Sequence, residues 1–126
     1  MSLERTELHN IILAGSEEEA IQYIKNEKYN IDEQDETGFT YLHCAIQIRS
    51  LSLVELLVKG GADINVQDIY GKTPLLLALS VYNGDTSIIE FLLDNNADTT
   101  IATNGGVTPL KFSKVKGIPD EIVKRL

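Results

Sequence analysis

The stretch GFTYLHCA at residues 38–45 decides the fold of this 126-residue chain, because it recurs twice further along. It returns as GKTPLLLA at residues 71–78 and, more loosely, as GVTPLKFS at residues 106–113. The following segment repeats as well, since LLVKGGAD at residues 56–63 matches FLLDNNAD at residues 91–98. A period near 33 residues predicts an array of stacked units in which each unit contacts only its neighbours. Arrays of this kind mostly bind other molecules, so the repeat favours binding over catalysis.

The net charge of the chain is −8, and this charge is unevenly distributed. Residues 1–38 hold ten acidic and three basic residues, whereas residues 107–126 hold two acidic and five basic ones. An acidic N-terminal half repels nucleic acid and anionic membranes and attracts a basic protein. The alternative interpretation is that the acidic surface only keeps the protein in solution.

The sequence carries no signal for a membrane or for an oxidising compartment. Cys44 is the single cysteine, which excludes an intramolecular disulfide. The longest apolar run, at residues 75–79, is far shorter than the roughly 20 residues that span a bilayer. The first five residues include an acid where a signal peptide carries basic residues. We therefore expect a cytoplasmic protein that binds neither nucleic acid nor membrane.

Each unit is predicted to contain a turn, a short helix, a second turn and a longer helix. In the unit at residues 32–64, Gly38 suits the turn and Thr40 can cap a helix that begins near Tyr41. The second helix is expected to end at Gly60–Gly61, where glycine can take the left-handed conformation, and Asn96 holds that place in the next unit. The expected inward positions are Leu42, Ala45, Ile46, Leu53, Val54, Leu56 and Leu57.

A helix pair this short cannot bury its own apolar face, so the terminal units must be modified to face water. Acidic residues 17–19 begin the second helix of the first unit, and five basic residues occur in the last unit. Both ends are therefore interpreted as polar caps, which argues against a fragment of a longer array. We predict one domain over residues 1–126, with units at about 4–31, 32–64, 65–99 and 100–126.

The repeated text resembles the ankyrin repeat, whose pattern runs D-x-x-G-x-T-P-L-H-x-A-A and then L-L-x-x-G-A-D. The second unit supplies Asp35, Gly38, Thr40, Leu42, His43, Ala45, Leu56, Leu57, Gly61, Ala62 and Asp63, and the third is nearly as complete. The departures are Tyr41 in place of Pro, Leu76 and Lys111 in place of His, Thr103 in place of Asp, and two extra residues within 81–84. The resemblance implies an all-α solenoid of stacked helix-turn-helix units with β-hairpin fingers at one edge. It also implies recognition of other proteins through the finger tips and the concave face of the first helices.

The resemblance assigns the partner-binding residues. On the finger tips they are Glu36, Thr37, Phe39, Ile69, Tyr70, Lys72 and Asn104, with Gly105 and Val107 at matching positions. On the concave face they are Gln47, Ile48, Ser80 and Val81. Tyr82 lies in the insertion, which the family pattern lacks, and could add a contact of its own. Exposed aromatic and aliphatic residues with polar neighbours are typical of binding hot spots. The alternatives are that the tips pack sideways on the adjacent finger, that the helix residues are partly buried against the next helix, and that the insertion is merely tolerated.

The candidate reactive residues do not form a site in the sequence. Cys44 and His43 would project about 100° apart on a helix, which is poor geometry for a nucleophile and its base. In the family, the histidine at position 43 ordinarily forms hydrogen bonds near the finger turns, and His9 stands alone near the N-terminus. One cysteine and two distant histidines do not give the ligands of a zinc site. We therefore expect no catalytic residue, no cofactor and no metal.

These observations predict a non-enzymatic protein-binding module that is a monomer when free. The sharper hypothesis is a small acidic inhibitor or immunity-type protein that binds and blocks a basic partner. One alternative is a scaffold subunit, or a fragment of a larger ankyrin assembly. Another, from a different class, is a small-molecule-binding or catalytic protein, which would need a pocket with convergent polar groups.

Overall fold

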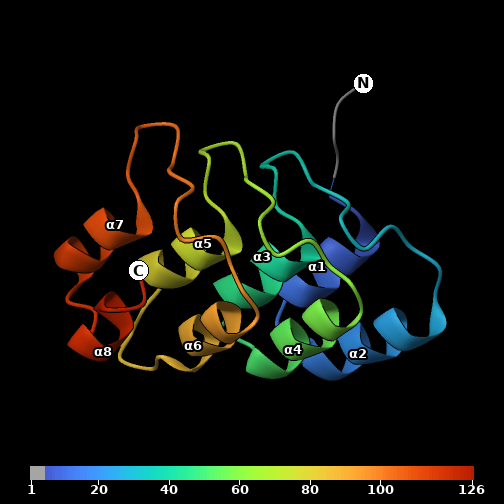
Figure 1. Cartoon of the computed structure of the whole chain (residues 1–126). Coiled ribbons are helices and arrows are strands. Elements are labelled where there is room, and N and C mark those ends of the chain that lie inside the picture. Colours follow the sequence, from blue (N-terminus) through green and yellow to red (C-terminus); the bar gives the residue numbers. More distant parts are fainter. Residues whose placement is uncertain (1–4) are drawn as a thin grey trace.

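The computed structural model describes residues 5–126, and within these residues the chain forms eight helices and no β-strand. The helices follow one another as four pairs stacked side by side, so the all-α solenoid expected from the repeat is confirmed (Figure 1). The helices are α1 (Glu7–Leu13), α2 (Glu17–Asn26), α3 (Tyr41–Gln47), α4 (Leu51–Lys59), α5 (Pro74–Ser80), α6 (Ser87–Asp94), α7 (Pro109–Lys116) and α8 (Asp120–Val123).

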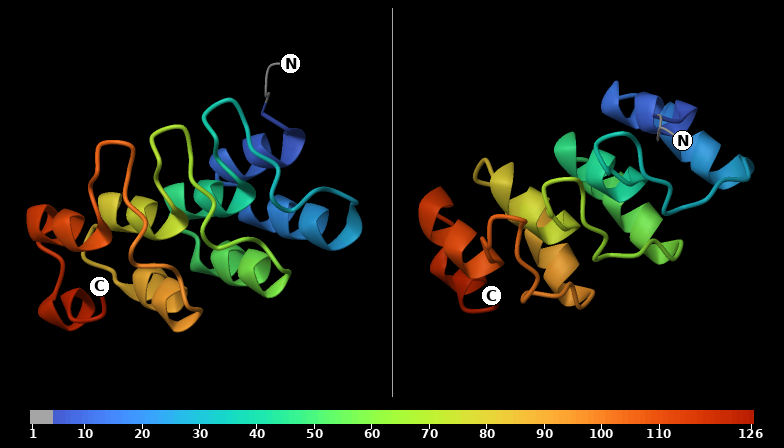
Figure 2. Two further views of the ribbon diagram at one scale, coloured as in Figure 1. Left: turned by 45° about the horizontal axis from the view of Figure 1, so that its top comes forward. Right: turned by 90° about the horizontal axis from the view of Figure 1, so that it is seen from above.

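The helices form two rows. The inner row runs α1, α3, α5 and α7, and each of these helices packs on the next; α2, α4 and α6 form the outer row in the same way. Three loops rise above the inner row at one edge of the stack (Figures 1 and 2). We name them finger 1 (residues 34–40), finger 2 (67–73) and finger 3 (102–108). Because the fingers stand side by side, their tips form a continuous edge.

Local chemistry fixes where the inner helices begin. The hydroxyl of Thr40 accepts a hydrogen bond from the backbone N–H of His43 at 3.3 Å, and Thr73 and Thr108 cap α5 and α7 in the same way. Satisfying one otherwise unpaired N–H at a helix start is typically worth about 1 kcal/mol. The predicted N-cap at Thr40 is confirmed. A threonine caps each of the three helices that follow a finger, α3, α5 and α7.

The outer helices end as the sequence predicts. Gly61 follows α4 with a φ of 99°, and Asn96 follows α6 with a φ of 65°. Both residues take the left-handed conformation that closes the last helical turn, where asparagine is the usual substitute for glycine. The repeat thus specifies where the inner helices begin and where α4 and α6 end through a few small residues.

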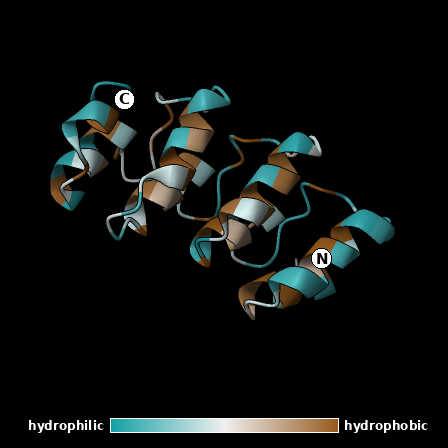
Figure 3. Ribbon diagram, turned by 90° about the horizontal axis from the view of Figure 1, so that it is seen from below, coloured by the Kyte–Doolittle hydropathy of each residue, from teal (hydrophilic) through white to brown (hydrophobic). Residues whose placement is uncertain are grey.

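The core is a linear layer shared between neighbouring units. Leu8, Leu42 and Leu75 hold the same position in three successive units and are completely buried. Their counterpart in the last unit, Leu110, is 39% exposed. Each helix carries hydrophobic and hydrophilic stretches, as expected for elements buried on one side (Figure 3). Burial therefore depends on the neighbouring unit, and it decreases at the last one.

The fingers differ in one detail from the β-hairpins that the resemblance implies. In finger 1, the N–H of Asp35 donates to the carbonyl of Phe39 at 2.9 Å. The N–H of Gly38 donates to the carbonyl of Asp35 at 2.9 Å and closes the turn. Between fingers 1 and 2, the N–H of Ile69 donates to the Thr37 carbonyl at 3.0 Å. Such isolated bonds do not make the repeated ladder that defines a strand. The fingers are hairpin-shaped loops.

Candidate functional site

Each finger is folded around the side chain of its first turn residue. In finger 2, Asp68 Oδ1 accepts the backbone N–H groups of Tyr70 and Lys72, both at 2.9 Å. Asp35 does the same in finger 1. In finger 3, Thr103 Oγ1 accepts one backbone N–H, from Val107 at 3.1 Å. The side chain at this position therefore accepts one backbone N–H fewer in finger 3 than in fingers 1 and 2.

Asp35 is buried and yet remains ionised. Burial alone would raise the pKa of its carboxyl, but hydrogen bonds from Thr37, Phe39 and Arg5 outweigh burial and lower that pKa. Arg5 Nε lies 3.2 Å from Asp35 Oδ2 and 3.6 Å from Glu36 Oε1. This pair ties the start of the described chain to finger 1.

Two histidines connect the inner helices to the fingers. The backbone N–H of Thr40 donates to His43 Nδ1 at 3.2 Å, so Nε2 carries the ring proton and donates it to the Lys72 carbonyl at 2.9 Å. Burial lowers the pKa of His43, which favours this neutral form. The predicted structural role of His43 is confirmed. His9 makes the equivalent bond to the Phe39 carbonyl at 2.9 Å, a role that the sequence analysis missed although Thr6 and His9 repeat the spacing of Thr40 and His43.

Fingers 2 and 3 are linked closely. Asn104 donates its backbone N–H to the Tyr70 carbonyl at 2.9 Å and its side-chain amide to the Ile69 carbonyl at 2.8 Å. Gln67 bridges the same fingers by donating to the carbonyls of Gly71 and Ala102. These bonds hold the two fingers at a fixed spacing.

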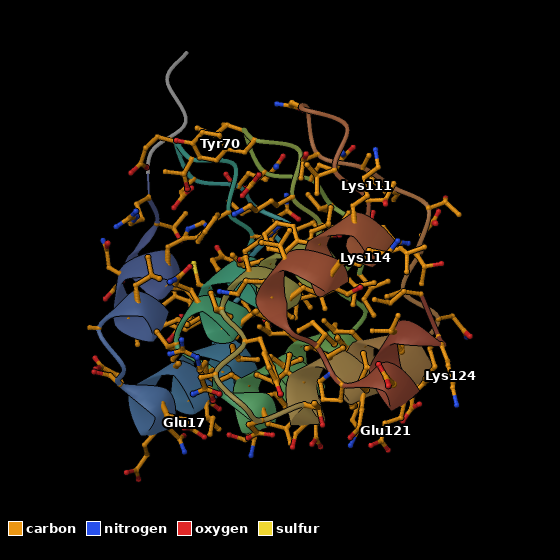
Figure 4. The ribbon with its side chains drawn as sticks, turned by 90° about the vertical axis from the view of Figure 1, so that its left-hand side faces the viewer. Glu17, Tyr70, Lys111, Lys114, Glu121 and Lys124 are labelled. Atoms are coloured by element: carbon orange, nitrogen blue, oxygen red, sulfur yellow. The ribbon has the colours of Figure 1, made fainter. Side chains whose placement is uncertain are left out.

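A groove of about 490 Å³ lies between fingers 2 and 3 and the start of α7. Tyr70 is its most prominent side chain, being 65% exposed (Figure 4). The Lys72 ammonium lies over the ring of Phe112, 5.8 Å from its centre, within the range of a cation–π interaction. We call this site the finger groove; its lining residues are Tyr70, Lys72, Thr103, Asn104, Gly105, Val107 and Phe112.

The predicted finger-tip residues fall in three places. Tyr70, Lys72 and Asn104 line the finger groove, and Ile69 lies next to them with 51% of its surface exposed. Glu36 is exposed beside Arg5, and the Thr37 hydroxyl donates to Asp35. Phe39 is half-buried and stacks on His43 of its own unit, with ring centres 5.3 Å apart. Phe39 therefore packs on the first helix of its own unit and does not stand free at the finger tip.

The predicted concave-face residues do not join the finger groove. Gln47 is exposed, Ile48 is half-buried, and the Ser80 hydroxyl donates to the Leu77 carbonyl at 2.7 Å. Val81 and Tyr82 line a separate pocket of about 280 Å³ between the α3–α4 and α5–α6 loops. Arg49 Nε bridges these loops by donating to the Val81 carbonyl at 2.9 Å. The insertion in the third unit thus forms one wall of a pocket of its own.

Three apolar residues of α7 were not among the predicted site residues. Phe112 completes the groove wall, while Leu110 and Val115 on α7 are 39% and 84% exposed. A signal for Leu110 was present in the repeat alignment, because Leu110 aligns with Leu42 and Leu75, which bury completely. Leu110 lies on α7, the last inner-row helix of the described residues.

The single thiol of the chain is buried in the core. Cys44 is buried within α3, and burial raises the pKa of its thiol. Over residues 5–126, no group of three or more His, Cys, Asp and Glu residues is arranged to hold a metal ion. No helix within the same range is long and apolar enough to cross a membrane.

The repeated units match an established family. A family model described as ankyrin repeats (3 copies) matches residues 2–68 and residues 49–126. The chain belongs to the ankyrin repeat family. Ankyrin repeats are protein–protein interaction modules, and the family is generally non-catalytic.

Relatives with this repeat come from distant organisms and differ in overall organisation. An ankyrin repeat-containing protein of Schizosaccharomyces pombe (P1E11.10) is 33% identical over 73% of this chain and 42% of its own length. Protein phosphatase 1 regulatory subunit 27 of Mus musculus is 36% identical over 78% of this chain and 62% of its own. Palmitoyltransferase AKR1 of Candida glabrata is 38% identical, but the match covers only 12% of that protein. The chain thus spans less than two thirds of each relative.

Proposed function

We propose that this ankyrin repeat protein is a non-enzymatic module that binds a partner protein through the finger groove and the exposed apolar side chains beside it. The observation that carries the proposal is the exposure of Tyr70 on a finger that is fixed on both sides. A tyrosine offers a large apolar ring with a hydroxyl for hydrogen bonding, and such residues dominate binding energy at protein interfaces.

The distribution of exposed apolar residues supports this placement. Over the described residues, the large hydrophobic side chains that are exposed are Ile69, Tyr70, Leu110 and Val115. Ile69 and Tyr70 belong to finger 2, whereas Leu110 and Val115 belong to α7. Ile69 and Tyr70 are neighbours at the tip of finger 2, and exposed large apolar side chains with polar neighbours are typical of interaction sites.

The rigidity of the fingers favours binding. Fingers 2 and 3 are linked by three hydrogen bonds from Asn104 and Gln67 to neighbouring carbonyls, at 2.8, 2.9 and 3.2 Å. A surface that is already ordered loses little conformational entropy when a partner arrives, and this raises affinity.

We propose in addition that the protein acts by blocking or regulating its partner and that this partner carries a basic surface. The support is the acidic first unit, where Glu17, Glu18 and Glu19 are all exposed on α2. The mouse relative is named a regulatory subunit, so the regulation of a partner has a counterpart among similar chains. Complementary charge would speed association, so the association rate should fall as salt increases. A rate that does not respond to salt would remove this part of the proposal, and the scaffold-subunit alternative would then be favoured.

The experiment is a pull-down from the source cells with three baits: the wild-type chain, Tyr70→Ala and Tyr82→Ala. The Tyr82 variant is the matched control, because it removes a tyrosine from the other pocket. Truncation of a hot-spot residue costs about 2 kcal/mol or more, so Tyr70→Ala should lose the partner by roughly 30-fold while Tyr82→Ala keeps it. If Tyr70→Ala retains the partner as well as the wild type does, the finger groove is not the site.

A further inference from the structure

The finger groove lies at the basic end of an acidic protein. The whole chain has a net charge of −8, yet residues 107–126 hold five basic and two acidic residues. Lys111 and Lys114 are exposed on α7, on the end of the stack that carries the groove (Figure 4). The segment that forms this end of the stack therefore carries a charge opposite in sign to the net charge of the chain.

The groove itself contains a cation and no anion. Lys72 contributes its ammonium group, and no acidic residue is among the lining side chains. The nearest carboxylate along finger 2 is Asp68, which is buried and accepts the N–H groups of Tyr70 and Lys72. These two hydrogen bonds hold the Asp68 carboxylate within the turn, and Asp68 is not among the residues that line the groove.

The Lys72 ammonium retains its capacity to donate hydrogen bonds. Its contact within the described residues is with the face of the Phe112 ring, and it forms no ion pair with a described carboxylate. A lysine has three N–H donors. A carboxylate entering the groove could accept from them in surroundings partly shielded from water, where a charged hydrogen bond is stronger than at an open surface.

We propose that the finger groove takes a partner segment in which an aromatic or large aliphatic side chain is flanked by acidic residues. The apolar side chain packs between Tyr70, Val107 and Phe112, and the acidic neighbours pair with Lys72 and face Lys111. This inference rests on the proposed function, since it specifies the chemistry of the segment bound at the same site. It concerns that segment and not the overall charge of the partner.

The inference also gives the partner an orientation. The acidic first unit attracts a basic surface of the partner, whereas the finger groove attracts an acidic segment. The charge of the stack therefore changes from negative to positive between the first unit and the last. A partner with both features would lie along the units in one direction, because the reverse direction places like charges against each other.

The test uses linear random peptides displayed on phage and selected on the immobilised full chain. We expect the recovered sequences to share an aromatic or large aliphatic residue with aspartate or glutamate beside it. A recovered peptide is then measured for affinity against Lys72→Glu and Lys28→Glu. Both variants change the net charge equally, but Lys28 lies beyond the end of α2 in the first unit, far along the chain from the groove.

The two variants should differ. Reversing the charge of a partly desolvated contact typically costs about 1 kcal/mol or more, so Lys72→Glu should weaken binding at least about fivefold. Lys28→Glu should change it less than about twofold, because exposed charges at long range are screened. Selected peptides that are basic or uncharged would overturn the inference, and so would an equal effect of the two variants. A thermal melt of each variant confirms that it is folded.

A third variant, Tyr70→Ala, separates this inference from the proposed function. If the selected peptides bind Tyr70→Ala as well as the wild type, they do not occupy the finger groove, and both the site and the inference fail. If Tyr70→Ala abolishes binding but the peptides carry no acidic residues, the site stands and only the inferred chemistry of the segment is wrong.

Discussion

Gly71 and Asn104 approach each other so closely that a β-carbon at residue 71 would lie 2.5 Å from the backbone nitrogen of Asn104. Real β-carbons essentially never come that near to another atom. Asn104 in turn carries the bonds to Ile69 and Tyr70 that hold finger 3 against finger 2. The width of the finger groove therefore depends on the absence of a side chain at residue 71.

A pair of glycine variants tests this dependence. Gly71 and Gly106 both have a φ of 82°, but a β-carbon at Gly106 meets nothing within 4 Å. Gly106→Ala should lose only the cost of a left-handed alanine, about 1 kcal/mol. Gly71→Ala must also separate the fingers and should lose about 2–4 kcal/mol. Urea unfolding measures both, and equal losses would mean that the close approach has no energetic consequence.

Thr103→Asp should stabilise the protein. Asp35 and Asp68 each accept two backbone N–H groups in their fingers, whereas Thr103 accepts only that of Val107. An aspartate at residue 103 could also accept from the backbone N–H of Gly105, and one more hydrogen bond typically contributes about 1 kcal/mol. The melting temperature should rise, and Thr103→Asn provides a neutral control of similar shape. A melting temperature that falls with aspartate would contradict the role assigned to these turn residues.

The free energy of unfolding should decrease as the pH falls below about 6.5, the ordinary pKa of histidine in an unfolded chain. Burial lowers the pKa of His43 in the folded protein, so below pH 6.5 the unfolded chain binds a proton that the folded one does not. The loss continues down to the lowered pKa. His43→Leu, which copies Leu76 of the next unit, should lose less stability over this window. Denaturant titrations at several pH values measure the difference, and identical slopes for the two proteins would exclude His43 as the source.

Cys44 should react with a thiol reagent only when the protein opens. Its side chain is fully buried in α3, and the raised pKa leaves little thiolate to react. Labelling of the folded protein should be at least about a thousandfold slower than labelling in strong denaturant. Fast labelling under native conditions would show that the α3 layer opens locally.

The repeat predicts the helices well, because a few small residues set their ends. Thr40 and Thr73 begin α3 and α5 through hydrogen bonds to their own hydroxyls. Gly61 and Asn96 follow α4 and α6 and act through their own φ angles. Such local effects do not depend on contacts with other units, which the sequence alone does not reveal. The register of the units follows from the same positions.

The finger groove was harder to predict because it depends on packing between units. Tyr70 and Asn104 were predicted as exposed finger residues, but Phe112 comes from a helix and reaches the groove only because α7 packs on α5. Phe39 was assigned to the surface by its position in the pattern, yet it stacks on His43. A position in the repeat gives the direction of the backbone, whereas the identity of the neighbouring side chain decides whether a residue is buried.

Amide hydrogen exchange of the protein with and without the partner retained in the pull-down would locate the binding surface. The finger groove should show slower exchange on binding at residues 70–72, 103–107 and 110–115, with little change in α2. Protection confined to α2 and the first unit, with fingers 2 and 3 unchanged, would contradict the assignment of the finger groove as the partner-binding site.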